Sequence, residues 1–208
     1  MSQSATITVF YDFLDDWNAI LGLTTPTHHR QMMQFLFDVW HDPPHRGLLM
    51  AFRHSGKSTV LGVFAACVLC IRPQTRILIL SAETNLAARM VAHIRNIIET
   101  HPSCTSLVPP KKNQWASTRI TVNRPPGIRE PSVVCQGIAG NITGMRADLI
   151  ICDDIEVPNT TNTPAKRENL RERLRELDFI LSPGGAMIYI GTPHTMDTIY
   201  RTSDDEIK

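Results

Sequence analysis

The chain has 208 residues, of which 42% are hydrophobic and 20% are charged. This length is enough for one large domain with a buried core, and this composition excludes a chain that is disordered throughout. With 21 basic and 20 acidic residues the formal net charge is +1, which excludes a protein that binds nucleic acid through its overall charge. Any contact with DNA is therefore expected to be local.

The sequence carries no sign of a membrane segment or of targeting. The longest apolar run, residues 60–71, is too short to span a bilayer, and the N-terminus MSQSATITVF lacks a basic region and a cleavage pattern. The five cysteines are odd in number and mostly lie in apolar runs, which is typical of reduced thiols in a cytosolic protein. Cys67 and Cys70 have CxxC spacing but lie on an apolar helical face, so zinc or redox use is not expected.

Two helices are predicted at the start of the chain, at residues 10–23 and 27–40. The second follows Pro26, is expected to be capped by Thr27 and ends before Asp42. Residues 1–46 are therefore expected to form a helical lead-in to the rest of the domain.

From residue 47 onward, predicted strands and helices alternate. Buried strands are predicted at 47–52, 76–82, 147–154 and 186–192, and helices at 57–71, 83–100 and 164–181. The expected inner faces are Leu86, Met90, Val91, Ile94 and Ile98 for the helix at 83–100, and Leu170, Leu174, Leu177 and Leu181 for the helix at 164–181. Such alternation is typical of an α/β fold with a mostly parallel central sheet flanked by helices.

One stretch, residues 101–144, departs from this alternation. It is rich in proline and contains short strand candidates at 119–122 and 132–136, which predicts a hairpin-like excursion. We expect a single domain over residues 1–208, with a core at 47–200.

The stretch AFRHSGKST, residues 51–59, follows a predicted strand and opens a predicted helix. In this context backbone N–H groups and the helix N-terminus face a phosphate chain. Gly56 permits close approach, Lys57 neutralises the β and γ phosphates, and Ser58 ligates Mg²⁺. The residues expected to contact ATP are Arg53, His54, Ser55, Gly56, Lys57, Ser58 and Thr59.

Two features of this loop bear on that interpretation. Ala51 stands where such loops usually have their first glycine, which is tolerable if Ala51 keeps a negative φ. The alternative, a chance GKS in a loop, is disfavoured by the buried strand and the apolar helix on either side.

The stretch LIICDDIE supplies the carboxylates that a magnesium nucleotide site needs beside the loop. Asp153 is the expected metal-side carboxylate, and Asp154 or Glu156 is expected to orient and activate water, with Asp154 preferred. Side chains alternate along a strand, so either Asp153 or Asp154 must lie where the strand ends and bends. The alternative role for these aspartates is a helix cap.

The stretch IYIGTPHT, residues 188–195, is a third buried strand that ends in a small, hydroxyl-bearing turn. Its order after the two other motifs suggests that Thr192 senses the γ phosphate or its water. A plain turn at the end of a strand is the alternative.

Together these stretches resemble the ATPase domain of the large terminase subunits of tailed bacteriophages, the motors that pump DNA into empty capsids. The matching stretches are AFRHSGKST, ITGMRADLIICDDIEVP and IYIGTPHT, with PTHHRQMMQFL upstream. The combination is more specific than any one motif and covers about residues 26–200.

The resemblance implies a P-loop fold of the additional-strand, catalytic-glutamate type. Arg53, three residues before the loop glycine, is a mark of the family's phosphate loop. The water-activating position is Asp154, where the family more often has glutamate, and this departure keeps Glu156 as an alternative. Thr192 would lie at the centre of the motif that couples hydrolysis to movement.

The family also has an adenine-contacting glutamine upstream of the loop. Gln31 or Gln34 matches it here, and His29 occupies a comparable place. Arginines that stabilise transition-state charge act in cis or come from a neighbouring subunit. Arg53 is the cis candidate or a nucleotide sensor, and Arg146 is the candidate that reaches a neighbour's site, or else forms an ordinary salt bridge.

The function implied is hydrolysis of ATP with Mg²⁺ that powers translocation of double-stranded viral DNA into a procapsid in the host cytoplasm. The implied partners are DNA, held transiently, a portal protein, the small terminase subunit and further copies of the chain in a ring, with no membrane. The family's C-terminal nuclease domain would follow residue 208, so we expect no DNA cleavage from this chain. The alternatives are a DNA helicase or remodelling ATPase, for which a second motor lobe is needed, and a nucleotide-binding assembly module without turnover.

Overall fold

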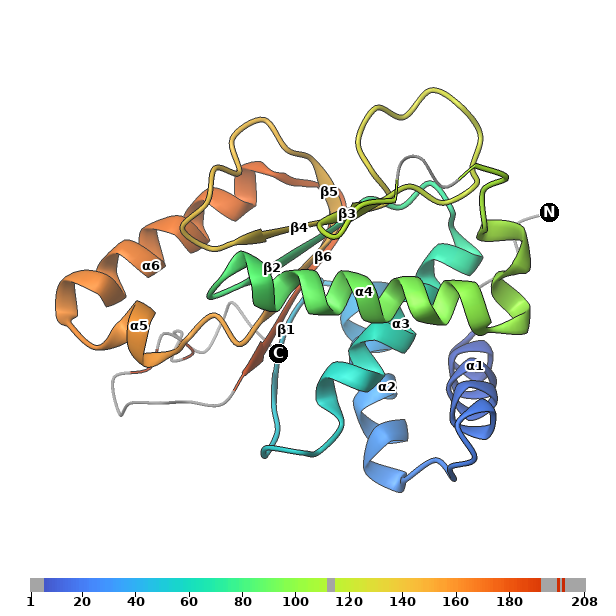
Figure 1. Ribbon diagram of the computed structural model, residues 1–208. Coiled ribbons are helices and arrows are strands. Elements are labelled where there is room, and N and C mark those ends of the chain that lie inside the picture. Colours follow the sequence, from blue (N-terminus) through green and yellow to red (C-terminus); the bar gives the residue numbers. More distant parts are fainter. Residues whose placement is uncertain (1–5, 112–114, 192–197, 199, 201–208) are drawn as a thin grey trace.

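The computed structural model describes residues 6–111, 115–191, 198 and 200 (Figure 1). Its strands are β1 (Arg46–Met50), β2 (Ile77–Ser81), β3 (Arg119–Ile120), β4 (Val133–Gly137), β5 (Ala147–Asp153) and β6 (Leu181–Gly191). They form one six-stranded sheet in the order β1-β6-β5-β2-β4-β3. Every neighbouring pair is parallel except β3 and β4, which confirms the predicted α/β fold with a mostly parallel sheet.

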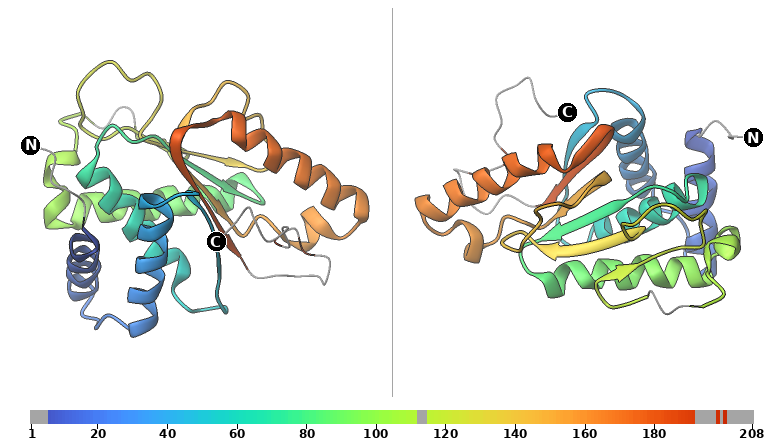
Figure 2. Two further views of the ribbon diagram at one scale, coloured as in Figure 1. Left: turned by 180° about the vertical axis from the view of Figure 1, so that it is seen from behind. Right: turned by 90° about the horizontal axis from the view of Figure 1, so that it is seen from above.

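Helices cover both faces of this sheet (Figures 1 and 2). They are α1 (Ile7–Ile20), α2 (Thr27–His41), α3 (Lys57–Ile71), α4 (Thr84–Thr100), α5 (Pro158–Thr161) and α6 (Pro164–Glu176), with 3-10 turns η1 (Pro102–Leu107) and η2 (Leu177–Phe179). The first four pack on one face and α6 on the other. Within the described part of the chain, no helix is long and apolar enough to cross a membrane.

The central strand β2 shows why a buried strand of this sheet is an apolar run in the sequence. Ile77 and Ile79 point into the larger core with α1 to α4, whereas Leu78 and Leu80 point into the core beneath α6. Because a parallel strand with helices on both sides is buried on both faces, its sequence does not alternate with polar residues. Helix α3 is likewise buried on nearly every side, since it lies between the sheet and the three other helices of its layer.

Three local predictions were wrong. Pro26, with φ −67° and ψ 148°, provides the extended N-cap residue of α2, so Thr27 is already helical and makes no side-chain cap. Leu86 is 38% exposed, because the buried stripe of α4 runs from Ala87 and Leu86 lies one residue outside it. Leu181 is not on α6, which ends at Glu176; it is the first residue of β6.

The stretch 101–144, expected as a hairpin-like excursion, contributes η1, β3 and β4. β3 runs antiparallel to β4, pairing Arg119 with Val134. β4 in turn lies parallel beside β2 within the sheet, pairing Val133 with Ile77. This stretch therefore extends the sheet beyond β2.

Candidate nucleotide site at the carboxyl edge of the sheet

Three strands that are far apart in the sequence end at the same edge of the sheet. Met50, the last residue of β1, pairs with Gly191, the last residue of β6. Asp153, the last residue of β5, pairs with Ile190 of β6. The tips of β1, β5 and β6 therefore lie side by side, as the three motifs require, because loops at the carboxyl ends of parallel strands form the binding crevice of such sheets.

The loop between β1 and α3 has the backbone of a phosphate-binding turn. Its residues with positive φ are His54 (φ 65°) and Gly56 (φ 80°), and Ala51 is not among the positive-φ residues of the chain, so its alanine fits. Gly56 is the N-cap residue of α3, and Lys57 begins the helix. The N-terminus of α3, with its partial positive charge and free N–H groups, therefore opens directly onto the tip of β1.

Lys57 and Asp154 meet at this edge. Lys57 is almost fully buried, and its Nζ lies 3.9 Å from Asp154 Oδ1. The chain bends sharply after β5, because Asp154 has a φ of 46° and its N–H donates to the carbonyl of Ile190 at 2.8 Å. The bend confirms the expectation that one of the two aspartates lies where the strand ends.

Asp153 carries a buried carboxylate oxygen beside this contact. Its Oδ1 is buried and has no hydrogen-bond partner among the described residues. Burial, and next the Asp154 carboxylate, raise the pKa of Asp153 to about 7, while Lys57 acts in the opposite direction. A cation at this oxygen would provide the interaction that the oxygen lacks, and it would keep the carboxylate ionised.

The surroundings fit Mg²⁺ rather than an ion held by protein alone. Within the described ranges, no group of three or more His, Cys, Asp or Glu side chains is placed to hold a metal. Mg²⁺ commonly takes only one or two protein ligands and completes its shell with water and substrate phosphates. Asp153 and the exposed Ser58 at the start of α3 would be those protein ligands.

Glu156, the alternative water-activating carboxylate, is buried and hydrogen-bonded to another side chain. It is 1% exposed, and its Oε2 accepts a hydrogen bond from the Thr198 hydroxyl at 2.6 Å. Of the two candidates, Asp154 is the one that the structure places beside the phosphate loop.

The remaining candidates are scattered. Arg53 is exposed in the loop, and Thr192 lies outside the described residues. Arg146 precedes β5, so the seven residues of that strand separate it from Asp154. At about 3.3 Å per residue this is a distance on the order of 20 Å, which removes Arg146 from the site of its own chain.

The upstream helix α2 reaches the loop through His28, which the sequence analysis did not name, and through His29, which it named only as a residue in a place comparable to the adenine-contacting glutamine. The side-chain nitrogens of His28 and His29 both contact the carbonyl oxygen of Ser55. Gln31 is exposed and lies on the same helical face as His28. Gln34, by contrast, is engaged by Tyr11 and Asp38.

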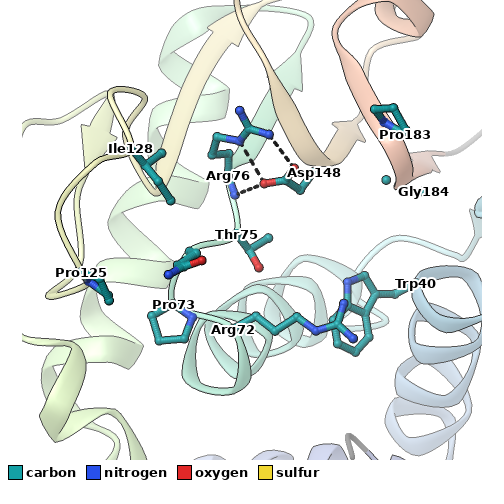
Figure 3. A pocket seen from close by; sticks show the side chains of 12 residues that line it. Trp40, Arg72, Pro73, Thr75, Arg76, Pro125, Ile128, Asp148, Pro183 and Gly184 are labelled. Atoms are coloured by element: carbon teal, nitrogen blue, oxygen red, sulfur yellow. Dashed lines mark hydrogen bonds and ion pairs between the residues drawn. The ribbon is translucent and has the colours of Figure 1, made fainter. Parts of the chain in front are cut away.

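A separate pocket of about 800 Å³ lies at the opposite edge of the sheet (Figure 3). Arg72 lies over the Trp40 ring at 4.6 Å, and Arg76 forms an ion pair with Asp148 at 2.7 Å. The pocket is lined by the segment that precedes β2, by Asp148 at the start of β5 and by the start of β6, so it is distinct from the edge that carries the phosphate loop.

The parallel sheet, the glycine–lysine–serine loop at the start of a buried helix and the carboxylates at the tip of β5 define the class of P-loop NTPases. The family model described as "Terminase large subunit, T4likevirus-type, N-terminal" matches residues 48–182. The terminase large subunit of Enterobacteria phage T3 is 36% identical over 160 residues, which are 76% of this chain and 27% of the T3 protein. The chain therefore belongs to the terminase large subunit family, which confirms the resemblance.

Solved structures agree at the level of the fold. The large terminase of bacteriophage HK97 superposes with a TM-score of 0.57 at 13% identity, over 92% of this chain and 38% of that one. Dbp5 of S. cerevisiae superposes with a TM-score of 0.52 at 12% identity, over 89% of this chain and 47% of that one. The chain thus spans about a quarter of the T3 relative and less than half of either structure.

Proposed function

We propose that this chain is an ATP-hydrolysing domain that powers translocation of double-stranded viral DNA into a procapsid. The observation that supports this most is the meeting of Lys57, at the start of α3, with Asp154, at the end of β5, in a member of the terminase large subunit family. A lysine that neutralises phosphates and a carboxylate that orients water are the two groups that hydrolysis of the γ phosphate requires at one place.

We base the proposed role of each site residue on its position. Lys57 and the loop N–H groups bind the phosphates, and Ser58 and Asp153 hold Mg²⁺, which supplies charge neutralisation on the phosphate oxygens when bound. Asp154 orients the attacking water. Glu156 serves instead as a buried acceptor that anchors Thr198.

The arginines divide between two sites. Arg53 lies within the loop and is exposed, so its guanidinium is free to turn toward a bound γ phosphate in cis. Arg146 lies beyond the opposite end of β5, so we propose that it serves a neighbouring subunit in a ring of copies. Thr192, in the segment after β6, is proposed to couple hydrolysis to movement.

The adenine and the macromolecular partners complete the proposal. Gln31, exposed on the face of α2 that reaches the loop, is the proposed adenine contact. The partners are transiently held double-stranded DNA, a portal protein and the small terminase subunit, in the cytoplasm of the host.

The test is phosphate release from ATP and Mg²⁺ by the wild type, Lys57→Ala and Asp154→Asn. We expect turnover in the wild type and a loss of at least about 100-fold in each variant. Wild-type turnover no faster than that of Lys57→Ala would leave only a nucleotide-binding module. A packaging assay with procapsids, in which Lys57→Ala leaves the capsids empty, tests the coupling to DNA.

A further inference from the structure

We propose that His28 and His29, in the first turn of α2, are positioning residues that hold the phosphate loop in its nucleotide-binding conformation. The inference rests on the proposed function, since it concerns the loop at which ATP would bind. It assigns a role to two side chains that precede Ser55 of the loop by 27 and 26 residues in the sequence and that contact it in the fold.

Both histidines bind the same backbone atom. His28 Nε2 lies 3.1 Å and His29 Nε2 lies 3.0 Å from the carbonyl oxygen of Ser55. A carbonyl only accepts, so both rings donate from Nε2–H. The two rings also pack against each other edge to face, with centroids 4.6 Å apart, so each limits the movement of the other.

Fixing this carbonyl fixes the direction of the next N–H. The peptide between Ser55 and Gly56 is planar and trans, so the carbonyl of Ser55 and the N–H of Gly56 point in opposite directions. When the carbonyl is held toward α2, the Gly56 N–H points away from α2. The two hydrogen bonds therefore preorganise a phosphate donor without touching the nucleotide.

The loop glycine is matched to this contact. A Cβ atom on Gly56 would overlap Nε2 of His29, so only glycine lets the imidazole approach the backbone so closely. Gly56 also has a φ of 80°, which side chains disfavour. The glycine thus serves two purposes: it allows the turn, and it leaves room for the histidine.

The environment of His29 suits a neutral donor. Its Nδ1 is buried and has no hydrogen-bond partner within the described part of the chain. Burial lowers the pKa of His29 below the usual histidine value, although the bond to Ser55 opposes this effect. His29 is therefore a neutral Nε2–H tautomer at pH 7, so it acts through the direction of its hydrogen bond and not through charge.

The experiment compares His29→Gln with His29→Met, because glutamine and methionine have nearly the same length and only glutamine keeps an N–H donor. His41→Met is the matched control, since His41 lies at the exposed end of the same helix. Two quantities are measured: the affinity for a fluorescent ADP analogue with Mg²⁺, and the hydrogen exchange of the amides of residues 52–58 without nucleotide.

For His29→Met we expect about fivefold weaker binding and about fivefold faster loop exchange, the effect of losing one hydrogen bond. His29→Gln should restore most of the nucleotide affinity and most of the protection of the loop from exchange. His41→Met should match the wild type in both measurements. Should His29→Met prove unfolded in circular dichroism, His28→Met and His28→Gln are compared in the same way.

Two results would overturn the inference: wild-type values for the methionine variant, or equal damage in the glutamine and methionine variants, which would indicate a role in shape alone. Failure of the proposed function has a different signature. If the wild type binds no nucleotide, the ATPase proposal fails, and the loop exchange measured without nucleotide still decides whether the histidines hold the loop.

Discussion

Lys57 Nζ lies 3.9 Å from Asp154 Oδ1 although the helices α3 and α4 and the strands β2 to β5 lie between these residues along the chain. The contact joins the first residue of α3 to the residue at which the chain bends after β5. Lys57 is nearly buried, whereas the Asp154 side chain is 46% exposed and faces the open edge. A phosphate that binds Lys57 would therefore lie close to the Asp154 carboxylate.

The first prediction separates the two candidate carboxylates. Asp154→Asn should lower the ATP turnover by at least about 100-fold, because the attacking water loses its base. Its affinity for ATP should stay the same or rise, since one negative charge near the phosphates is removed. Glu156→Gln should keep turnover within a few fold, because amide and carboxylate alike can accept from Thr198. Phosphate-release and nucleotide-binding assays check this, and the reverse pattern would assign the water to Glu156.

The second prediction concerns the space next to Gly56. Gly144 has nearly the same backbone conformation, with φ 79° against 80°, but a Cβ there meets nothing within 4 Å. Gly144→Ala should therefore cost only the left-handed strain of about 1–2 kcal/mol. Gly56→Ala adds the overlap with His29, a further cost of about 1–3 kcal/mol. Denaturant unfolding of both variants gives the comparison, and equal losses would mean that His29 does not pack on the loop.

Much of the fold was predictable because its central elements are buried on all sides. The strand β2 and helix α3 from Val60 onward are almost entirely apolar, so their places in the chain follow from the sequence pattern. The edge at which the motifs meet was also predictable, since parallel strands joined by helices place all their carboxyl ends together. The position of Lys57, Asp153 and Asp154 at this edge was predicted in this way.

Contacts between side chains that no local pattern links were not predictable. Nothing in the stretch THHRQ indicates that His28 and His29 donate to the carbonyl of Ser55, because the contact depends on how α2 packs beside the loop. The buried Glu156 likewise accepts a hydrogen bond from Thr198, 42 residues further along the chain. Alternation along a strand predicts the face of a residue only as far as the strand continues, and β5 ends at Asp153.

The third prediction concerns the opposite edge of the sheet (Figure 3). Asp148 accepts from the backbone N–H of Arg76 and from its Nε and Nη2, at 2.8, 3.0 and 2.7 Å. Asp148→Asn should lower the free energy of unfolding by about 2 kcal/mol, because hydrogen bonds to a charged group are lost. Asp178→Asn is the control: Asp178 is half exposed and pairs with Arg46, so its loss should cost less than about 1 kcal/mol. Urea unfolding distinguishes the two, and equal costs would contradict the prediction.

The pH dependence of the same pair has a definite sign. Burial raises the pKa of Asp148, but the hydrogen bonds and the charge of Arg76 outweigh it, so the folded-state pKa lies below the usual aspartate value. The stabilisation is therefore complete above the unfolded-state pKa of about 4 and is lost as the pH falls through the folded-state pKa. In Asp148→Asn this loss of stability at low pH should be absent.

The last prediction concerns Asp153, whose shift has the opposite sign. Its folded-state pKa of about 7 is above that of an unfolded aspartate. The unfolded chain therefore releases this proton first, and between about pH 4 and pH 7 the folded state loses stability as the pH rises. The full shift corresponds to about 4 kcal/mol at pH 8, so Asp153→Asn should stabilise the nucleotide-free, metal-free chain there and change little at pH 4.

Thermal unfolding of the wild type and Asp153→Asn in EDTA at pH 4 and pH 8 measures this difference. With Mg²⁺ and ADP the order should reverse, because the ion favours the ionised carboxylate of the wild type, and asparagine provides only a neutral ligand. Asp154→Asn is the control for a general effect of removing charge at this edge, and it should retain the stabilisation by Mg²⁺ and ADP. If Asp153→Asn gained as much stability from Mg²⁺ and ADP as the wild type, Asp153 would not be the metal ligand, and its buried oxygen would need another explanation.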